Sequence, residues 1–136
     1  MDPAALAVLN ARLAGIAHEM GAVLQRSAYS PNINERADCS AAVFGPDGTL
    51  LAQAEHIPVH LGAMPASVRA ALDMLDAHGT VVADGDQVIV NDPYAGGTHL
   101  NDVTLVAPAF DDDGRLLGWV ANRAHHADVE IGRAHV

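Results

Sequence analysis

The chain has 136 residues, 50% of them hydrophobic, and its seven Lys and Arg against seventeen Asp and Glu give a formal net charge of −10. One domain with a buried core fits this length and composition, and a disordered tail does not. The negative charge argues against nucleic acid as a partner. No apolar run approaches the roughly 20 residues that span a membrane. The single cysteine fits a reducing compartment, which favours the cytoplasm.

A helix is predicted over residues 2–26. Asp2 can cap its first turn, and Pro3 suits the first helical position. Apolar side chains recur every three or four positions along one face, at Leu6, Leu9, Leu13, Ile16, Met20 and Leu24. We expect this face to pack on a core or on another subunit. The polar face lacks the Lys and Arg stripe of a helix that lies on a membrane.

Two β-hairpins are predicted further along the chain. ADCSAAVF (37–44) and TLLAQA (49–54) flank the turn GPDG, whose proline fixes one dihedral angle and whose glycine permits a positive φ. VTLVAPAF (103–110) and LLGWVA (116–121) flank DDDG in the same way. Each pair of strands is therefore expected to be antiparallel.

A second helix and a short strand are predicted between the hairpins. Residues 65–78 have helical spacing, with Gly79 as a natural C-cap, and residues 87–90 form an apolar strand. Hairpins rather than helical crossovers join most strands. The sequence therefore predicts an α+β fold, in which a largely antiparallel sheet built from two hairpins carries the N-terminal helix and the central helix.

Polar residues gather at the ends of the predicted strands. Asp38 lies at the start of the first strand, His99 and Asp102 at the start of the fourth, and His125, His126 and Asp128 just beyond the end of the fifth. In an antiparallel hairpin the start of one strand lies beside the end of the other, so the last two groups should be close in space. Neutral imidazole and carboxylate groups suit Mn, Fe or Zn, which makes this strand end a candidate metal site.

Each of these residues also fits a purely structural role. A histidine at a strand end is often hydrogen-bonded or exposed, Asp102 can cap a turn, and Asn91 to Tyr94 fit as turn residues. His56 and His60 either line a pocket or add polarity to a loop, and Cys39 fits as a small buried residue. The combination of groups at one end of the sheet favours the site.

Three long stretches point to a known family: ERADCSAAVFGPDGTLLAQAEHIPVHLGAMP, GDQVIVNDPYAGGTHLNDVTLVAPAF and WVANRAHHADV. In this order they resemble the N-terminal part of the hydantoinase B/oxoprolinase family, over roughly residues 20–129. That family includes the B subunits of ATP-dependent hydantoinases, the corresponding half of 5-oxoprolinase, and subunits of acetone and acetophenone carboxylases. The resemblance implies that a hydantoinase A-type subunit or domain binds ATP and phosphorylates the substrate, while the B-type half completes the reaction at a divalent metal, Mn, Zn or Fe.

Carried onto this sequence, the resemblance implies metal ligation by Asp38, His99, Asp102 and His125, with His125 slightly preferred to His126. Further candidates for the pocket around the metal are His56, His60, Asp92, Gly96, Gly97, His126 and Asp128. The implied reaction is opening of a small cyclic amide, hydantoin or 5-oxoproline. A carboxylase subunit and a non-enzymatic small-molecule-binding module stay open as alternatives. The sequence has no P-loop, so ATP is assigned to the partner.

The length of family subunits and the point where the resemblance stops predict how the chain is divided. Subunits of this family are several hundred residues long, so residues 1–129 are predicted to be the N-terminal segment of a truncated domain that is inactive alone. Residues 130–136, EIGRAHV, resemble the translation of a sequencing adapter and are predicted to be a non-native tail. His135 is therefore left out of the candidate ligands.

Overall fold

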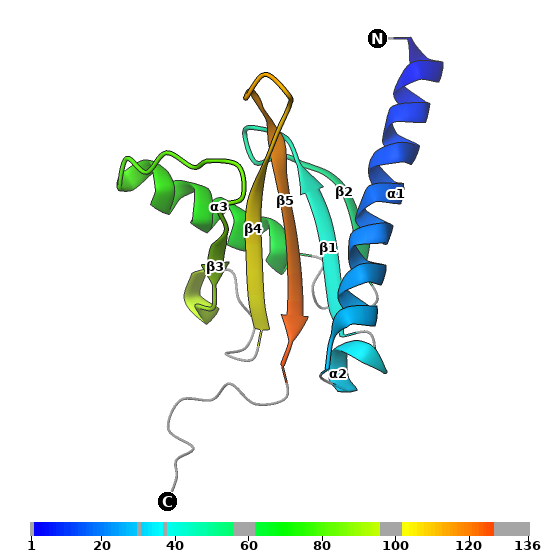
Figure 1. Ribbon diagram of the computed structural model, residues 1–136, viewed down its shortest axis with the longest axis vertical. Coiled ribbons are helices and arrows are strands. Elements are labelled where there is room, and N and C mark those ends of the chain that lie inside the picture. The colour runs from blue at the N-terminus through cyan, green and yellow to red at the C-terminus, as the bar shows by residue number, and fades with distance from the viewer. Residues whose placement is uncertain (1, 30, 37, 56–61, 96–101, 127–136) are drawn as a thin grey trace, which may run out of the picture.

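The computed structural model describes residues 2–29, 31–36, 38–55, 62–95 and 102–126. Five strands form one antiparallel sheet in the order β2-β1-β5-β4-β3. The elements are α1 (Pro3–Ser27), α2 (Pro31–Asn34), β1 (Cys39–Phe44), β2 (Leu50–Glu55), α3 (Ala63–Ala77), β3 (Val88–Val90), the 3-10 turn η2 (Pro93–Ala95), β4 (Asp102–Phe110) and β5 (Leu116–His125). Figure 1 shows α1 alongside β1 and β2, and α3 across the other side of the sheet. The predicted α+β fold is confirmed.

Both hairpin turns form as their residues predict. Gly48 and Gly114 have φ of 88° and 81°, in the region that favours glycine. In the first turn Asp47 Oδ1 accepts the Thr49 backbone N–H at 3.0 Å, and in the second Asp111 Oδ1 accepts the Arg115 N–H at 2.8 Å. These hydrogen bonds satisfy backbone N–H groups within each turn and stabilise the turn that sets the register of its strands.

The helix α1 begins and ends within one residue of its predicted bounds. The Asp2 carboxylate accepts the Ala4 N–H at 3.4 Å as a weak N-cap. Its buried residues are small, Ala17 and Gly21, which lie four positions apart and let the helix approach β1 and β2 closely. The predicted apolar face is only partly covered, and Leu6, Leu9 and Ile16 are exposed. Within the described ranges, no helix is long and apolar enough to cross a membrane.

The main core lies between the sheet and α3. Alternate residues of the central strands point to this face, and the core joins Phe44, Val106 and Trp119 to Val68 and Leu72 of α3. The opposite face carries a smaller cluster of Ile33, Cys39 and Ala124. The sheet therefore has two different faces, and successive residues of a strand place their side chains alternately on one face and the other.

Several element boundaries differ from the predictions. Strand β5 continues to His125 instead of ending at residue 121, because Asn122 to Ala124 pair with both β1 and β4. His125 is thus the last residue of the strand and does not lie beyond it. The helix α3 begins at Ala63, two residues earlier than predicted, and the four-residue helix α2 was not predicted.

Candidate functional site

Asp38, His125 and Asp102 lie in one row across the end of the sheet. Asp102 and His125 are direct register partners of β4 and β5. On the other side of His125, its backbone N–H donates to the Asp38 carbonyl at 3.1 Å, immediately before β1 begins. The antiparallel pairing therefore brings together residues that are 23 positions apart in β4 and β5, as the strand order predicts.

The side chains of Asp102 and His125 contact each other directly. His125 Nδ1 lies 2.9 Å from Asp102 Oδ1, with the carboxylate side chain 1% exposed and the imidazole side chain 28% exposed. An ionised carboxylate only accepts, so the imidazole proton of this bond sits on Nδ1, and the ring's acceptor lone pair is then on Nε2. A divalent ion that bound both side chains would displace this proton, because metal ligands bind in their deprotonated forms.

The backbone of Asp102 is fixed from the β3 side. Asn91 Nδ2 donates to the Asp102 carbonyl at 2.9 Å, which ties the end of β3 to the start of β4. The next residue, Asp92, accepts the Tyr94 backbone N–H at 2.9 Å. This is the turn role that the sequence left open for Asp92, and it shapes η2.

A buried arginine that sequence analysis missed lies next to this pair. Arg123 is 0% exposed, and its Nε–H donates to Thr104 Oγ1 at 2.8 Å. Its Nη2 donates to Ser67 Oγ and, at 3.5 Å, to the Ala63 carbonyl, both on α3. Burial lowers the pKa of the Arg123 guanidinium, and the nearby Asp102 charge acts in the opposite direction. The sequence does indicate this burial, because Arg123 follows the core residues Trp119 and Ala121 at the two-residue spacing of one strand face.

The remaining predicted residues fall in two groups. His56, His60, Gly96, Gly97, His99, Asp128 and the tail 130–136 lie outside the described residues. His126 lines a hollow with Leu24 and Ala28 of the α1 side, so it and His125 belong to different faces of the sheet. Among the described side chains alone, no three His, Cys, Asp or Glu gather closely enough to hold a metal ion.

Cys39 belongs to the small cluster on the α1 face. Burial raises the pKa of its thiol, and the neighbouring Asp38 charge raises it further. A thiol that resists ionisation is a poor metal ligand, because the ligand is the thiolate. The structural role that the sequence favoured for Cys39 agrees with its burial.

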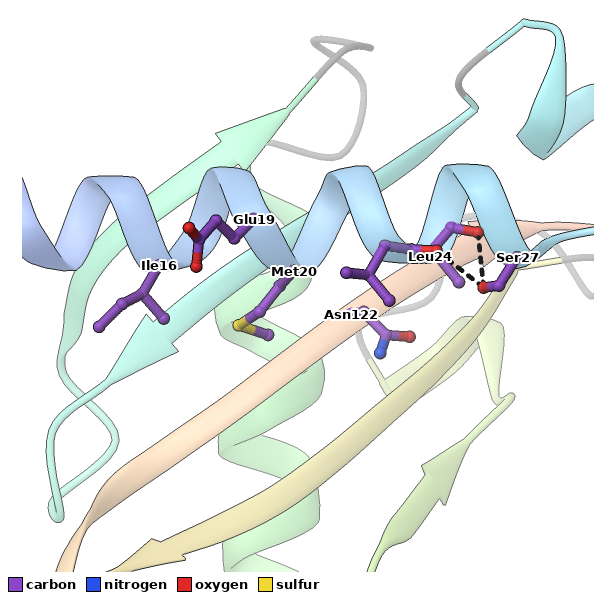
Figure 2. Close-up of a pocket in the computed structure, with 7 residues that line it drawn as sticks. Ile16, Glu19, Met20, Leu24, Ser27 and Asn122 are labelled. Carbon is purple, nitrogen blue, oxygen red and sulfur yellow. Dashed lines mark hydrogen bonds between the residues drawn. The ribbon is translucent and has the colours of Figure 1, made fainter.

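A groove of about 500 Å³ runs between α1 and β5, lined by Ile16, Glu19, Met20, Val23, Leu24, Ser27 and Asn122. In Figure 2 the side chain of Met20 on the helix points toward the strand that carries Asn122. Asn122 alternates with Arg123 along β5, so the groove and the Asp102–His125 pair lie on opposite faces of the sheet. This groove is therefore separate from the candidate site.

Comparison with known proteins identifies the family. The family model described as hydantoinase B/oxoprolinase matches residues 2–132. The chain belongs to this family. A relative in Arabidopsis thaliana, 5-oxoprolinase 1, is 48% identical over 128 residues, covering 94% of this chain and 10% of the relative.

Two solved structures of larger enzymes contain a similar fold. An acetone carboxylase in a nucleotide-free state matches with a TM-score of 0.79 and 25% identity, covering 91% of this chain and 16% of that chain. The ATP-dependent caprolactamase of Pseudomonas jessenii matches with a TM-score of 0.73 and 28% identity, covering 94% and 21%. The chain spans only 10% to 23% of the length of the first curated relatives that it matches.

Proposed function

We propose that this chain forms part of the metal site of an ATP-coupled enzyme that opens small cyclic amides of the hydantoin or 5-oxoproline type. The observation that carries the proposal is the contact between Asp102 and His125 at the end of the sheet. The family supports it, since the Arabidopsis relative is a 5-oxoprolinase and one structural relative is an ATP-dependent caprolactamase. Both names refer to enzymes that act on lactams.

The donor set fits a divalent ion. Carboxylate oxygen and imidazole nitrogen are ligands that Mn, Zn and Fe accept, and the raised pKa of Cys39 argues against a thiolate site. In this proposal His125 and Asp102, whose Nδ1 and Oδ1 atoms face each other at 2.9 Å, bind one ion together with His99 and Asp38, and the proton between the two atoms is released. When bound, such an ion supplies Lewis acidity toward a substrate carbonyl oxygen.

The protein's own part is to hold these ligands in place. The Asp102 carboxylate fixes the orientation of the His125 ring, and the pairing of β5 with its two neighbours fixes the spacing of the row. Prior positioning matters because small displacements of a reacting group are costly to catalysis.

The proposal assigns ATP to a hydantoinase A-type subunit or domain that works with the full-length subunit in the cytoplasm. The two structural relatives support coupling to ATP, as their descriptions name ATP-dependent carboxylation and an ATP-dependent caprolactamase. The 136-residue chain by itself is proposed to be inactive.

A carboxylase subunit is the second candidate, because an acetone carboxylase contains a similar fold. The TM-score is 0.79 at 25% identity to that carboxylase and 0.73 at 28% identity to the caprolactamase. In this proposal both reactions use an ATP-binding partner and complete the chemistry on the subunit that contains this chain. The substrate that is turned over with ATP separates them.

The test uses the full-length subunit with its ATP-binding partner. His99→Ala, Asp102→Ala and His125→Ala are each expected to lose bound metal and ATP-dependent ring opening of hydantoin or 5-oxoproline. The matched control is His126→Ala, which removes the adjacent imidazole from the other face of the sheet and is expected to retain metal. Metal content by mass spectrometry and turnover are the measurements. Unchanged metal and activity in the first three variants would contradict the proposal, and bicarbonate-dependent consumption of a ketone instead of ring opening would establish the carboxylase.

A further inference from the structure

We propose that Arg123 is a positioning residue that couples the Asp102–His125 pair to the helix α3, so that the arrangement of the pair depends on how α3 is docked. The inference deepens the proposed function and rests on it for the role of the pair. Its physical basis is a chain of contacts from α3 through one guanidinium to β4 and β5.

The guanidinium joins two structural elements through separate nitrogen atoms. Nε–H donates to Thr104 Oγ1 on β4 at 2.8 Å, while Nη2 donates to Ser67 Oγ within the first two turns of α3. Both hydroxyl residues are buried, Ser67 at 0% and Thr104 at 1% exposure. The rigid fork of an arginine allows few other orientations when two nitrogens are held in this way.

The register places Arg123 next to the pair. Thr104 is the partner of Arg123 across β4 and β5. His125, two residues after Arg123 in β5, is the partner of Asp102, two residues before Thr104 in β4. The four residues therefore share the α3 face of the sheet, with Arg123 diagonal to Asp102. The effect of the Asp102 charge on the Arg123 pKa agrees with this proximity.

A role in fold stability alone would not require a charge at this position. The two preceding residues of β5 on the same face are Trp119 and Ala121, which pack in the apolar core against α3. An apolar residue of suitable size at position 123 would avoid the cost of burying a cation. The change from apolar packing to a buried guanidinium occurs where the row of candidate ligands begins.

The test removes the acceptors of Arg123 and leaves the arginine in place. Substituting Arg123 itself would leave Asp102 without a nearby buried charge and would destabilise the fold. Ser67→Ala removes the hydroxyl acceptor on α3 and leaves only the 3.5 Å contact to the Ala63 carbonyl. Thr104→Val removes the acceptor on β4 with little change in shape. Val106→Ala is the matched control, since Val106 is 0% exposed, lies on β4 on the same face, and belongs to the apolar core.

The first readout needs no metal. In the metal-free, full-length subunit labelled with 15N-histidine, the His125 Nδ1–H resonance is assigned by its loss in His125→Ala and reports the bond to Asp102. We expect Ser67→Ala and Thr104→Val to broaden or shift this resonance. Val106→Ala is expected to lower the urea midpoint and to leave the resonance in place. A His125 Nδ1–H resonance that is unchanged in both acceptor variants would overturn the inference. It would also be overturned if Val106→Ala, with a similarly lowered urea midpoint, changed the resonance as much as the acceptor variants do.

The second readout is the dissociation constant of Mn²⁺, followed by the electron paramagnetic resonance of the free ion. The acceptor variants are expected to bind Mn²⁺ about tenfold more weakly, the lower end of the range for outer partners of metal ligands. An unchanged constant in both would count against the inference. If the wild-type subunit bound no Mn²⁺, Zn²⁺ or Fe²⁺, the proposed function would fail, while the imidazole resonance would still decide whether Arg123 positions the pair.

Discussion

Adding a methyl group at Gly118 should destabilise the protein, whereas the same addition at Gly15 should stabilise it. A Cβ at Gly118 would overlap the backbone carbonyl oxygen of Phe44, while a Cβ at Gly15 would meet no atom within 4 Å. The carbonyl cannot move cheaply, because Phe44 pairs with Leu50 on one side and Trp119 on the other and its side chain is fully buried.

The size of each effect follows from these surroundings. Overpacking of this kind costs about 1–3 kcal/mol, so we expect Gly118→Ala to lower the free energy of unfolding by about 2 kcal/mol. Gly15 lies inside α1, where alanine is favoured over glycine by about 0.8–1.0 kcal/mol. The two variants should therefore differ in sign, although the chemical change is identical.

Urea denaturation followed by tryptophan fluorescence measures both effects. The sequence has one tryptophan, Trp119, which is 5% exposed in the main core and reports the loss of that core. With an m-value of about 2 kcal/mol/M, Gly118→Ala should lower the midpoint by roughly 1 M and Gly15→Ala should raise it by about half as much. Shifts of the same sign, or an unchanged midpoint for Gly118→Ala, would refute this reasoning.

Three further outcomes are expected of the 136-residue chain. Asp2→Ala should lower the free energy of unfolding by about 0.5 kcal/mol in urea denaturation, because the cap bond to Ala4 is long and exposed. The hydrogen bond from the Thr49 backbone N–H lowers the pKa of Asp47 below its ordinary value. The ionised carboxylate therefore stabilises the fold above about pH 4, and this contribution is lost as the pH falls. The difference in urea midpoint between wild type and Asp47→Ala should shrink below about pH 4. The chain should associate with itself through the exposed apolar side of α1. Sedimentation should show less association for Ile16→Gln than for wild type, and equal association of the two would contradict this.

The sequence predicted the hairpins well because their turns are encoded locally. Aspartate and glycine at fixed positions determine both turns, with a proline in the first, and alternating apolar residues mark the strands beside them. The antiparallel geometry then sufficed to place Asp102 beside His125, although 23 positions separate them. The proximity of Asp102 to the group His125 and His126 could thus be predicted without any knowledge of the helices, and the structure then shows that the partner is His125.

Other features depend on contacts that a local pattern does not contain. Asn122 to His125 look like the start of a polar loop, yet they continue β5 because β1 and β4 pair with them on both sides. Arg123 was missed for this reason, since its burial is visible only once the strand is extended. The partial exposure of α1 has a similar cause, because periodicity shows which face is apolar and not how much of it a neighbour covers.

The central claim is that the Asp102–His125 pair belongs to a metal site. Anomalous diffraction from a crystal of the full-length subunit grown with Zn²⁺, collected on both sides of the zinc absorption edge, tests it most directly. The account predicts an anomalous peak about 2.0–2.2 Å from a nitrogen of His125 and an oxygen of Asp102. A peak at other residues, with the Asp102–His125 contact intact and no metal beside it, would contradict the account.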